Sequence, residues 1–138
     1  MTHLEEYQKL IKSGGVIVGE WIGKEIDNLC DDLDNPAYIY DTAEADKRIA
    51  FMEALCLQGK APYYNKPIKL MPWQKAFIEC LYGFKMRETG FRRFTEGLLE
   101  IARKNGKSSL FAADGLADLF IGRGGSDIAC CSNDDRQC

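Results

Sequence analysis

Residues 98–120, "LLEIARKNGKSSLFAADGLADLF", constrain the fold of this 138-residue chain more than any other part of its sequence. They begin within a short apolar run, 95–102, that predicts a β-strand, and they end in residues 107–120, where apolar side chains recur at helical spacing. A second strand is predicted at 127–131, after the turn "GRGGS". The order strand, helix, strand with short connections predicts parallel strands, a right-handed crossover and an α/β fold.

The loop between that strand and that helix, residues 103–106, is the candidate functional segment. Gly106, Lys107 and Ser108 match the second half of the pattern G-x-x-x-x-G-K-[ST], in which backbone N–H groups and a helix N-terminus surround phosphates. Isoleucine replaces the first glycine of the pattern, so an ordinary solvated turn remains the alternative. A lysine in a first helical turn opposes the helix dipole, and a bound anion removes that conflict. We therefore predict a phosphate-binding loop, on the condition that a strand precedes it and that Lys107 starts the helix.

Four helices are predicted before this strand. In chain order, one follows Thr2, one spans 18–33, one follows Asp41, and one begins at Pro72 in "PWQKAFIECLYGF". Thr2 and Glu5 have the spacing of a capping box, and Gly14 ends the first helix. Gly59 is the predicted end of the third helix. The segment "KAPYYNKPIKLM", residues 60–71, is rich in turn formers and is interpreted as a linker between front and back.

Composition limits the classes of function. With 46% hydrophobic residues the chain can bury a core, and its net charge of -3 argues against a generally basic nucleic-acid coat. Its six cysteines include no C-x-x-C pair, which favours reduced structural thiols over a metal or redox centre. We expect a cytoplasmic protein, because no signal segment opens the chain and no apolar run is long enough to span a bilayer.

Several segments together resemble one protein family. The segment "GFRRFTEGLLEIARKNGKSSLFAA" looks like the ATPase motif of the large terminase subunits of tailed phages and prophages, which carry an A-R-K-x-G-K-[ST] loop without the first glycine. Upstream, "KPIKLMPWQKAFIECLYGFK" is similar to the adenine-side segment of that family, where a proline-aromatic-glutamine group starts a helix. The family's N-terminal helix and loop resemble "DKRIAFMEALCLQGKAPYYNKPI", and its next strand and D-R-x-Q turn resemble "IACCSNDDRQC".

The resemblance implies a domain organisation. Residues 1–59 would form a helical N-terminal region, and residues 60–138 the first part of a P-loop ATPase domain with a glutamine motif, a Walker A phosphate loop and a second strand. The implied fold is the start of a RecA-like parallel sheet. The strand that ends in the Asp and Glu needed for magnesium and for the attacking water is missing, as is the nuclease domain. We therefore expect an N-terminal fragment of a terminase, truncated in its gene or cut from a longer chain.

The resemblance also implies roles for individual side chains. Lys107 corresponds to the phosphate-binding lysine, Ser108 to the magnesium ligand, and Arg103 to a loop arginine that approaches the γ-phosphate. Arg103 and Lys107 are thus the candidate catalytic residues. Gln74 corresponds to the glutamine that binds the adenine edge through its amide. The full set of candidate nucleotide-binding residues is Gln74, Lys104, Asn105, Gly106, Lys107, Ser108 and Ser109.

The whole protein implied by the resemblance is an ATP-driven motor that packages double-stranded DNA into procapsids in the host cytoplasm. ATP and Mg²⁺ would be its cofactors, and double-stranded DNA, a small terminase subunit and a portal its partners, in a ring oligomer without a membrane. For the 138-residue chain alone we expect weak Mg-ATP binding and no turnover, unless Glu100, Asp114 or Asp134 completes the site.

Two alternatives stay open from the sequence. The chain could belong to another P-loop ATPase, such as a helicase with a glutamine motif. It could also be a non-catalytic remnant, in which the helical front or the basic stretch 85–93 contacts DNA or a protein.

Overall fold

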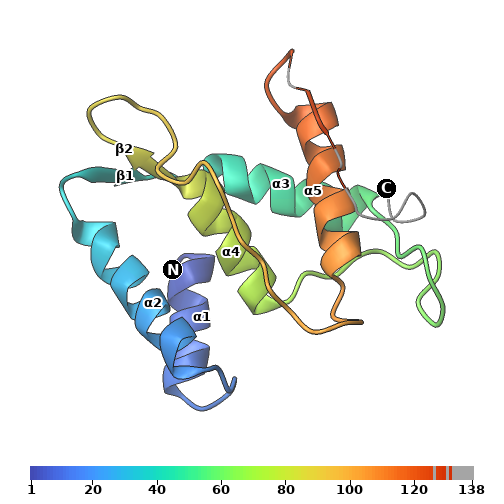
Figure 1. Cartoon of the computed structure of the whole chain (residues 1–138), viewed down its shortest axis with the longest axis horizontal. Helices are drawn as coiled ribbons and strands as arrows, with labels where there is room; N and C mark the ends of the chain where they lie inside the picture. The colour runs from blue at the N-terminus through green and yellow to red at the C-terminus, as the bar shows by residue number, and fades with distance from the viewer. Residues whose placement is uncertain (126, 130, 132–138) are drawn as a thin grey trace.

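The computed structural model of the chain describes residues 1–125, 127–129 and 131. In this part, five α-helices, one 3₁₀ turn and two short strands follow one another (Figure 1). They are α1 (His3–Lys12), α2 (Glu20–Asp31), η1 (Asp32–Asp34), β1 (Tyr38–Tyr40), α3 (Ala43–Leu55), α4 (Pro72–Gly83), β2 (Phe84–Met86) and α5 (Lys107–Ile121). Helix α4 is central, because α1 and α3 both pack against it, while α2 packs on α1 and α5 packs on α3.

The sequence signals for helix starts are confirmed. The Glu5 N–H donates to Thr2 Oγ1 (3.2 Å), and the Thr2 N–H donates to the Glu5 carboxylate (2.7 Å), which is the predicted capping box. Pro72 occupies the first turn of α4, where its fixed φ suits a helix and its missing N–H would have had no helical partner. Helix α5 begins at Lys107, as predicted.

The third helix is shorter than predicted. Helix α3 ends at Leu55 rather than at Gly59, because the next residue, Cys56, has an extended backbone (φ -93°, ψ 134°). Apolar side chains at helical spacing along α3 and at the residue after it, Ala45, Ile49, Met52 and Cys56, are nevertheless all buried.

The segment after α3 forms a closed surface loop rather than an open linker. The Ile68 N–H donates to the Cys56 carbonyl (2.9 Å), and the Gln58 N–H donates to the Lys66 carbonyl (2.8 Å). Residues 59–65 between these bonds are exposed. The chain therefore returns to the point where it left the core before it enters α4.

The observed sheet differs from the predicted one. Strands β1 and β2 pair antiparallel, with Ile39 opposite Lys85 and Tyr40 opposite Phe84. Phe84 is fully buried, and its ring contacts the rings of Tyr38, Tyr40 and Phe94 at centroid distances of 6.1, 4.5 and 5.9 Å. This sheet was not predicted, although "YIY" is a run of strand-forming residues between two turn signals.

The strand predicted at 95–102 is wrong for the described structure. This segment runs beside α4 without regular secondary structure, and no described residue forms a hydrogen bond with its backbone. A β-strand requires a neighbouring strand whose backbone groups form hydrogen bonds with its own. The apolar composition of the segment was therefore not enough to predict a strand. Residues 127–129 and 131 of the second predicted strand are also irregular, and Cys130 and the D-R-x-Q turn lie outside the described residues. The predicted parallel sheet is thus absent from the described part.

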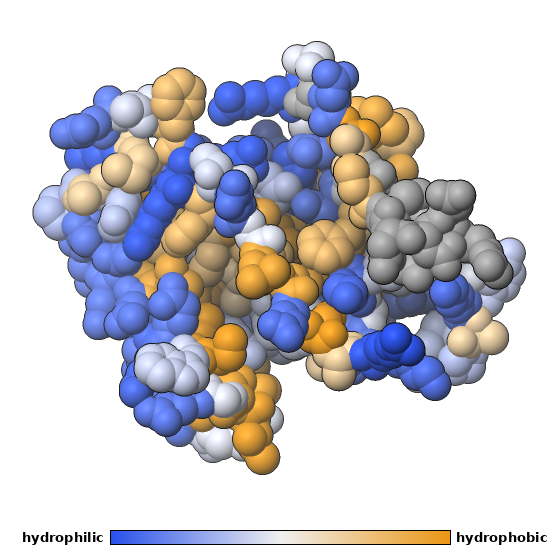
Figure 2. Space-filling view, viewed as in Figure 1, coloured by the Kyte–Doolittle hydropathy of each residue, from blue (hydrophilic) through white to orange (hydrophobic). Residues whose placement is uncertain are grey.

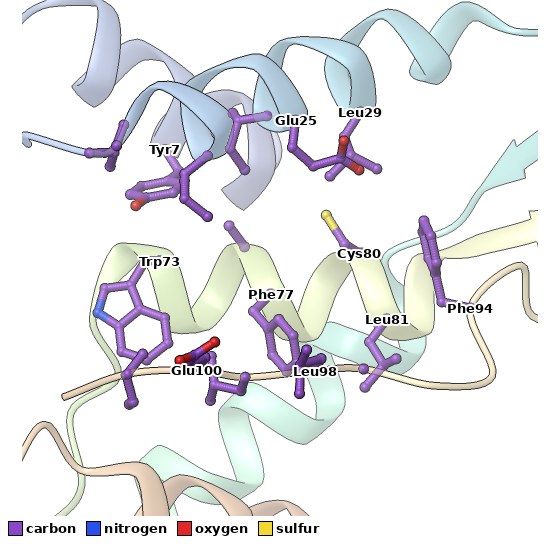
Figure 3. Close-up of a pocket in the computed structure, with 18 of the residues that line it drawn as sticks. Tyr7, Glu25, Leu29, Trp73, Phe77, Cys80, Leu81, Phe94, Leu98 and Glu100 are labelled. Carbon is purple, nitrogen blue, oxygen red and sulfur yellow. The ribbon is translucent and has the colours of Figure 1, made fainter. Parts of the chain in front are cut away.

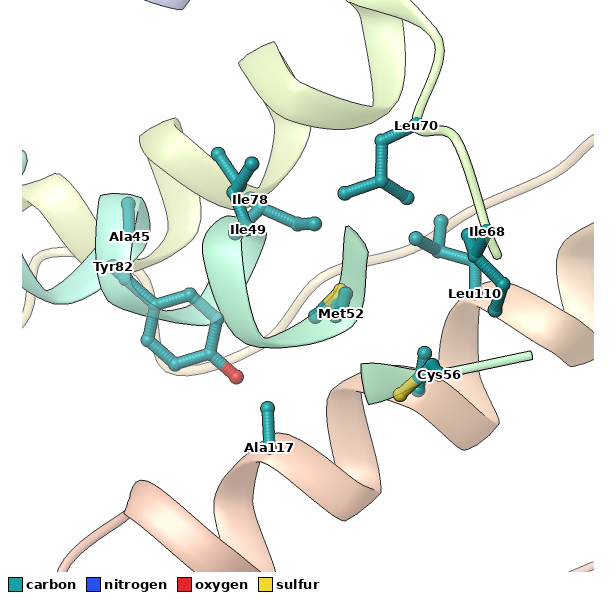
Figure 4. Close-up of a cluster of buried hydrophobic side chains, with 11 residues drawn as sticks. Ala45, Ile49, Met52, Cys56, Ile68, Leu70, Ile78, Tyr82, Leu110 and Ala117 are labelled. Atoms are coloured by element: carbon teal, nitrogen blue, oxygen red, sulfur yellow. The ribbon is translucent and has the colours of Figure 1, made fainter. Parts of the chain in front are cut away.

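The larger core joins three helices and the segment before α4 (Figure 4). Its buried side chains are Ala45, Ile49, Met52, Cys56, Ile68, Leu70, Ile78, Tyr82, Leu110, Ala113 and Ala117. A smaller core around Leu4, Leu29 and Phe84 holds α1 and α2 to the sheet. Since the first core includes residues from both sides of the predicted boundary at residue 59, α5 is positioned by α3 as well as by α4.

An apolar groove of about 700 Å³ lies between α2, α4 and residues 94–101 (Figure 3). Three apolar side chains of α4, Trp73, Phe77 and Leu81, line it. The carboxylates of Glu25, Glu96 and Glu100 also border it. Figure 2 shows apolar side chains exposed on this face, between the α1/α2 pair and α5. Every helix in the described part is too short or too polar to cross a membrane.

Candidate functional site

The loop before α5 has an unusual backbone. Lys104 and Gly106 both have positive φ angles, 70° and 77°, and Asn105 between them does not. A left-handed residue on each side of a residue with negative φ turns successive N–H groups toward one concave side, an arrangement that binds anions. Because lysine rarely adopts a positive φ, this shape is imposed by the loop as a whole.

The first turn of α5 offers N–H groups that have no partner among the described residues. Gly106 is the N-cap residue and supplies no side-chain oxygen, and the first turn contains no acidic residue. The Leu110 N–H, which donates to the Gly106 carbonyl (2.9 Å), is the first to join the helical hydrogen-bond pattern. The N–H groups of Lys107, Ser108 and Ser109 precede it and are the orphan donors of the helix start. Such a terminus favours a bound anion through both its donors and the helix dipole.

The cations of the loop are accessible. Arg103, Lys104, Asn105, Gly106, Lys107 and Ser108 are exposed, and Ser109 is half-buried. None of the three cations of this group forms an ion pair with another described residue. The sequence-predicted residues of the loop are therefore gathered on one surface, with positive charge and free N–H donors side by side.

The structure also brings Gln74 to this loop. Its side chain is buried (7% exposed), and its Oε1 accepts a hydrogen bond from the Met71 N–H (2.8 Å) at the start of α4. Its Nε2 lies 3.8 Å from the position that a Cβ on Gly106 would occupy. The amide oxygen of Gln74 thus accepts a hydrogen bond from the start of its own helix, while the amide nitrogen lies near the loop. The binding of adenine by Gln74 stays a prediction.

The basic stretch 85–93 is used differently. Lys85 pairs with Asp41 (2.8 Å), Arg93 pairs with Asp32 (2.6 Å), and the Arg87 guanidinium donates to two backbone carbonyls. The Arg92 guanidinium lies 5.0 Å from the Tyr82 ring centroid. Residues 84–93 form a short hairpin, in which the Met86 N–H donates to the Phe91 carbonyl (2.8 Å) and the Arg93 N–H to the Phe84 carbonyl (2.8 Å). The cations of this hairpin are thus used in contacts of the fold, with which the interface suggested for a non-catalytic remnant would have to compete.

Sequence reasoning missed a buried charge cluster that joins three helices. Arg48 of α3 is 3% exposed, donates through Nη2 to Asp118 of α5, and lies over the ring of Tyr82 of α4 (3.8 Å). The Tyr82 O–H donates to Asp114 Oδ2 (3.0 Å). Burial raises the pKa of Asp114, although the Tyr82 hydrogen bond and Arg48 oppose this effect. The signal was available, because Arg48 interrupts the apolar stripe of α3 between Ala45 and Ile49.

One group among the described residues has the composition of a metal site: the side chains of His3, Asp46 and Glu79, whose donor atoms lie within 4.8 Å of one another. Glu79 already accepts hydrogen bonds from the His3 N–H (2.8 Å), the Leu4 N–H (3.1 Å) and the Tyr40 O–H. We therefore interpret this group as a cap for α1. Ser108, the predicted magnesium ligand, is not a member of it.

The sequence set two conditions for a phosphate-binding loop, and the structure meets one. Lys107 starts the helix, but no strand precedes it in the described part. Asp114, one of the carboxylates considered for completing the site, is bound by Tyr82 and Arg48, and Asp134 lies outside the described residues. What the geometry supports on its own is an anion-binding helix start.

Comparison with known proteins finds a similar family for the second half of the chain. Residues 72–138 match the family described as "Terminase large subunit, ATPase domain", and this match includes Gln74 and the whole loop. The chain is 36% identical over 78 residues to the "Terminase, large subunit" of Enterobacteria phage HK97. This alignment covers 54% of the chain but 14% of the relative. No solved structure matches the chain.

Proposed function

Residues 72–138 belong to the ATPase region of phage terminase large subunits, and on this premise we propose that the loop 103–109 binds the phosphates of Mg-ATP. The observation that carries the proposal is the backbone of the loop. Two left-handed residues, Lys104 and Gly106, lead directly into an uncapped helix start, which is the geometry that cradles phosphate oxygens.

The proposal gives each side chain a role that its position allows. Lys107, at the first position of α5, would neutralise phosphate charge, and Arg103 would bind a terminal phosphate through its planar guanidinium. The Ser108 hydroxyl would hold Mg²⁺, which would supply positive charge to offset that of the phosphates. Gln74, adjacent to Gly106, would bind the adenine or fix the loop that holds the phosphates.

The proposal extends to the fold of the longer protein. We expect residues 95–102 to become a strand when neighbouring strands of a RecA-like parallel sheet are present, because their backbone has no partner among the described residues. The chain spans 14% of the length of its terminase relative. We propose that the whole protein is an ATP-driven motor that packages double-stranded DNA and contacts a portal and a small subunit.

Binding of Mg-ATP to the 138-residue chain and to Lys107→Ala tests the proposal. We expect a Kd in the millimolar range, of the order of the 4 kcal/mol that a few exposed phosphate contacts supply, and a loss of at least about tenfold in the variant. Lys60→Ala, at the exposed loop before α4, is the matched control and should bind as the unmodified chain does. Equal affinity of Lys107→Ala and the unmodified chain would refute a phosphate-binding role for the loop.

Phosphate release from the same proteins tests the expected lack of turnover. Phosphoryl transfer needs carboxylates that hold magnesium and orient water, and Asp114 is occupied by Tyr82 and Arg48. We expect no hydrolysis above background. Hydrolysis that Lys107→Ala abolishes would show that this chain contains the carboxylates that complete the site.

A further inference from the structure

Helix α4 approaches the α5 region at its start and again two turns later. At its start, Gln74 Nε2 lies 3.8 Å from the position that a Cβ on Gly106 would occupy, and two turns later the Tyr82 O–H donates to Asp114 Oδ2 (3.0 Å). The two points are the same number of residues apart along both segments. The helices therefore run in the same direction, and α4 fixes both the loop and a position well inside α5.

Arg48 reinforces the second of these points. Its guanidinium lies over the Tyr82 ring (3.8 Å), its Nη2 donates to Asp118, and its Nη1 lies 3.5 Å from Asp114 Oδ1. One buried cation of α3 thus binds Asp118, lies close to Asp114 and lies over the ring of Tyr82, whose hydroxyl binds Asp114. Arg48 Nη1 and Asp114 Oδ1 are buried and have no hydrogen-bond partner among the described residues, so this contact is close but not fully formed.

The position of these carboxylates along α5 connects them to the loop. With 3.6 residues per turn, Asp114 and Asp118 lie about two and three turns after Lys107, on the same stripe of the helix. The distance along the axis from Lys107 to Asp114 is about 10 Å at 1.5 Å per residue. Two anchors one turn apart on that stripe resist both rotation and tilting of α5.

We propose that Arg48 is a positioning residue for the loop 103–109. Through Asp114 and Asp118 it sets the rotation of α5, and thereby the direction in which Lys107 and the first-turn N–H groups point. The inference rests on the proposed function for the identity of the ligand, but the position of the loop can be measured without any ligand.

The test compares three variants of the 138-residue chain by amide NMR spectra and by Mg-ATP titration. Arg48→Lys keeps the charge but loses the planar guanidinium, and Asp118→Asn removes one carboxylate whose side chain is 38% exposed. Glu53→Gln is the matched control, because Glu53 pairs with Lys75 (2.9 Å) and accepts from the Leu70 N–H (3.0 Å), and neither partner belongs to α5. We expect Arg48→Lys and Asp118→Asn to move the amide signals of Gly106, Lys107 and Ser108 and to weaken Mg-ATP binding roughly threefold to tenfold.

The control should lose stability and leave the loop signals and the affinity unchanged, which separates positioning from general destabilisation. If Arg48→Lys does not fold, Asp118→Asn still decides the question. Folded variants with unchanged loop signals and unchanged affinity would overturn the inference. Absence of Mg-ATP binding by the unmodified chain would instead refute the proposed function, and the loop signals of the free variants would still test Arg48.

Discussion

The two helices α1 and α5 begin in opposite ways. At the start of α1, Thr2 and Glu5 form a capping box and the buried carboxylate of Glu79 accepts the N–H groups of His3 and Leu4. At the start of α5, no side chain of the described residues caps the helix, the first turn contains no acidic residue, and Lys107 adds positive charge. The same physical demand, for an acceptor at a helix N-terminus, is satisfied inside the fold in one case and left open in the other.

This difference separates structural from functional use of the same feature. An internal carboxylate at α1 holds the N-terminal helix on α4, since Glu79 belongs to α4 and is 1% exposed. An open terminus at α5 contributes less to stability, and the loop before it keeps a backbone that suits an external anion. Variants at the two helix starts should therefore have different consequences.

The largest expected effect is at Glu79. Glu79→Ala leaves the His3 N–H, the Leu4 N–H and the Tyr40 O–H without their acceptor, and we expect a loss of about 3 kcal/mol in the free energy of unfolding. Urea denaturation measures it. Glu88→Ala, at the exposed tip of the hairpin, is the control and should change stability by less than about 0.5 kcal/mol. A loss of stability in Glu79→Ala no larger than that of the control would refute the structural role of Glu79 at the start of α1.

An effect of intermediate size is expected when a glycine near each of the two helices is replaced by alanine. Gly106 and Gly14, just after α1, have almost the same positive φ (77° and 75°). An added Cβ would meet no atom within 4 Å at Gly14, and at Gly106 only Gln74 Nε2, at an ordinary contact distance of 3.8 Å. Replacement by alanine should therefore cost about 1 kcal/mol at both sites, from backbone strain alone. Only Gly106→Ala should also weaken Mg-ATP binding, measured by titration at a temperature where both variants are folded. A similar loss of affinity in Gly14→Ala would mean that stability, not loop shape, controls binding.

The smallest effect concerns pH. Hydrogen bonding from the Thr2 N–H lowers the pKa of Glu5 in the folded chain. The contribution of Glu5 to stability is therefore present above its unfolded pKa and is lost as the pH falls through the lower, folded pKa. Because Glu5 is partly exposed, we expect this contribution to the free energy of unfolding to be about 0.5 kcal/mol. The free energy of unfolding, measured from neutral to acidic pH, should depend less steeply on pH in Glu5→Gln than in the unmodified chain. Identical pH dependences of the two proteins would contradict the role of Glu5 in the capping box.

Local signals predicted much of this structure. The capping box at Thr2, the proline at the start of α4 and the helix start at Lys107 were read from the sequence because each depends on neighbouring residues alone. The predicted end of α3 was wrong, because the Cys56 carbonyl accepts a hydrogen bond from the N–H of Ile68, a residue that is distant in sequence.

The remaining errors also involve distant partners. The strand at 95–102 was predicted from composition, but a strand requires a neighbour that the described part does not supply. The strands β1 and β2 were missed because their pairing joins segments on either side of two helices. The candidate residues of the loop could be proposed from the sequence because they are consecutive. Arg48 was missed because its partners, Tyr82 and Asp118, lie on α4 and α5.

The loop after α3 has a practical consequence for experiments. Its two ends are fixed to each other by the bonds between Cys56 and Ile68 and between Gln58 and Lys66, and residues 59–65 between them are exposed. An inserted peptide would lengthen a loop whose ends stay in place, and the entropy of loop closure rises slowly with length. An epitope tag or a fluorophore attachment site at residues 59–65 should therefore leave α3, α4 and the loop before α5 in their present arrangement.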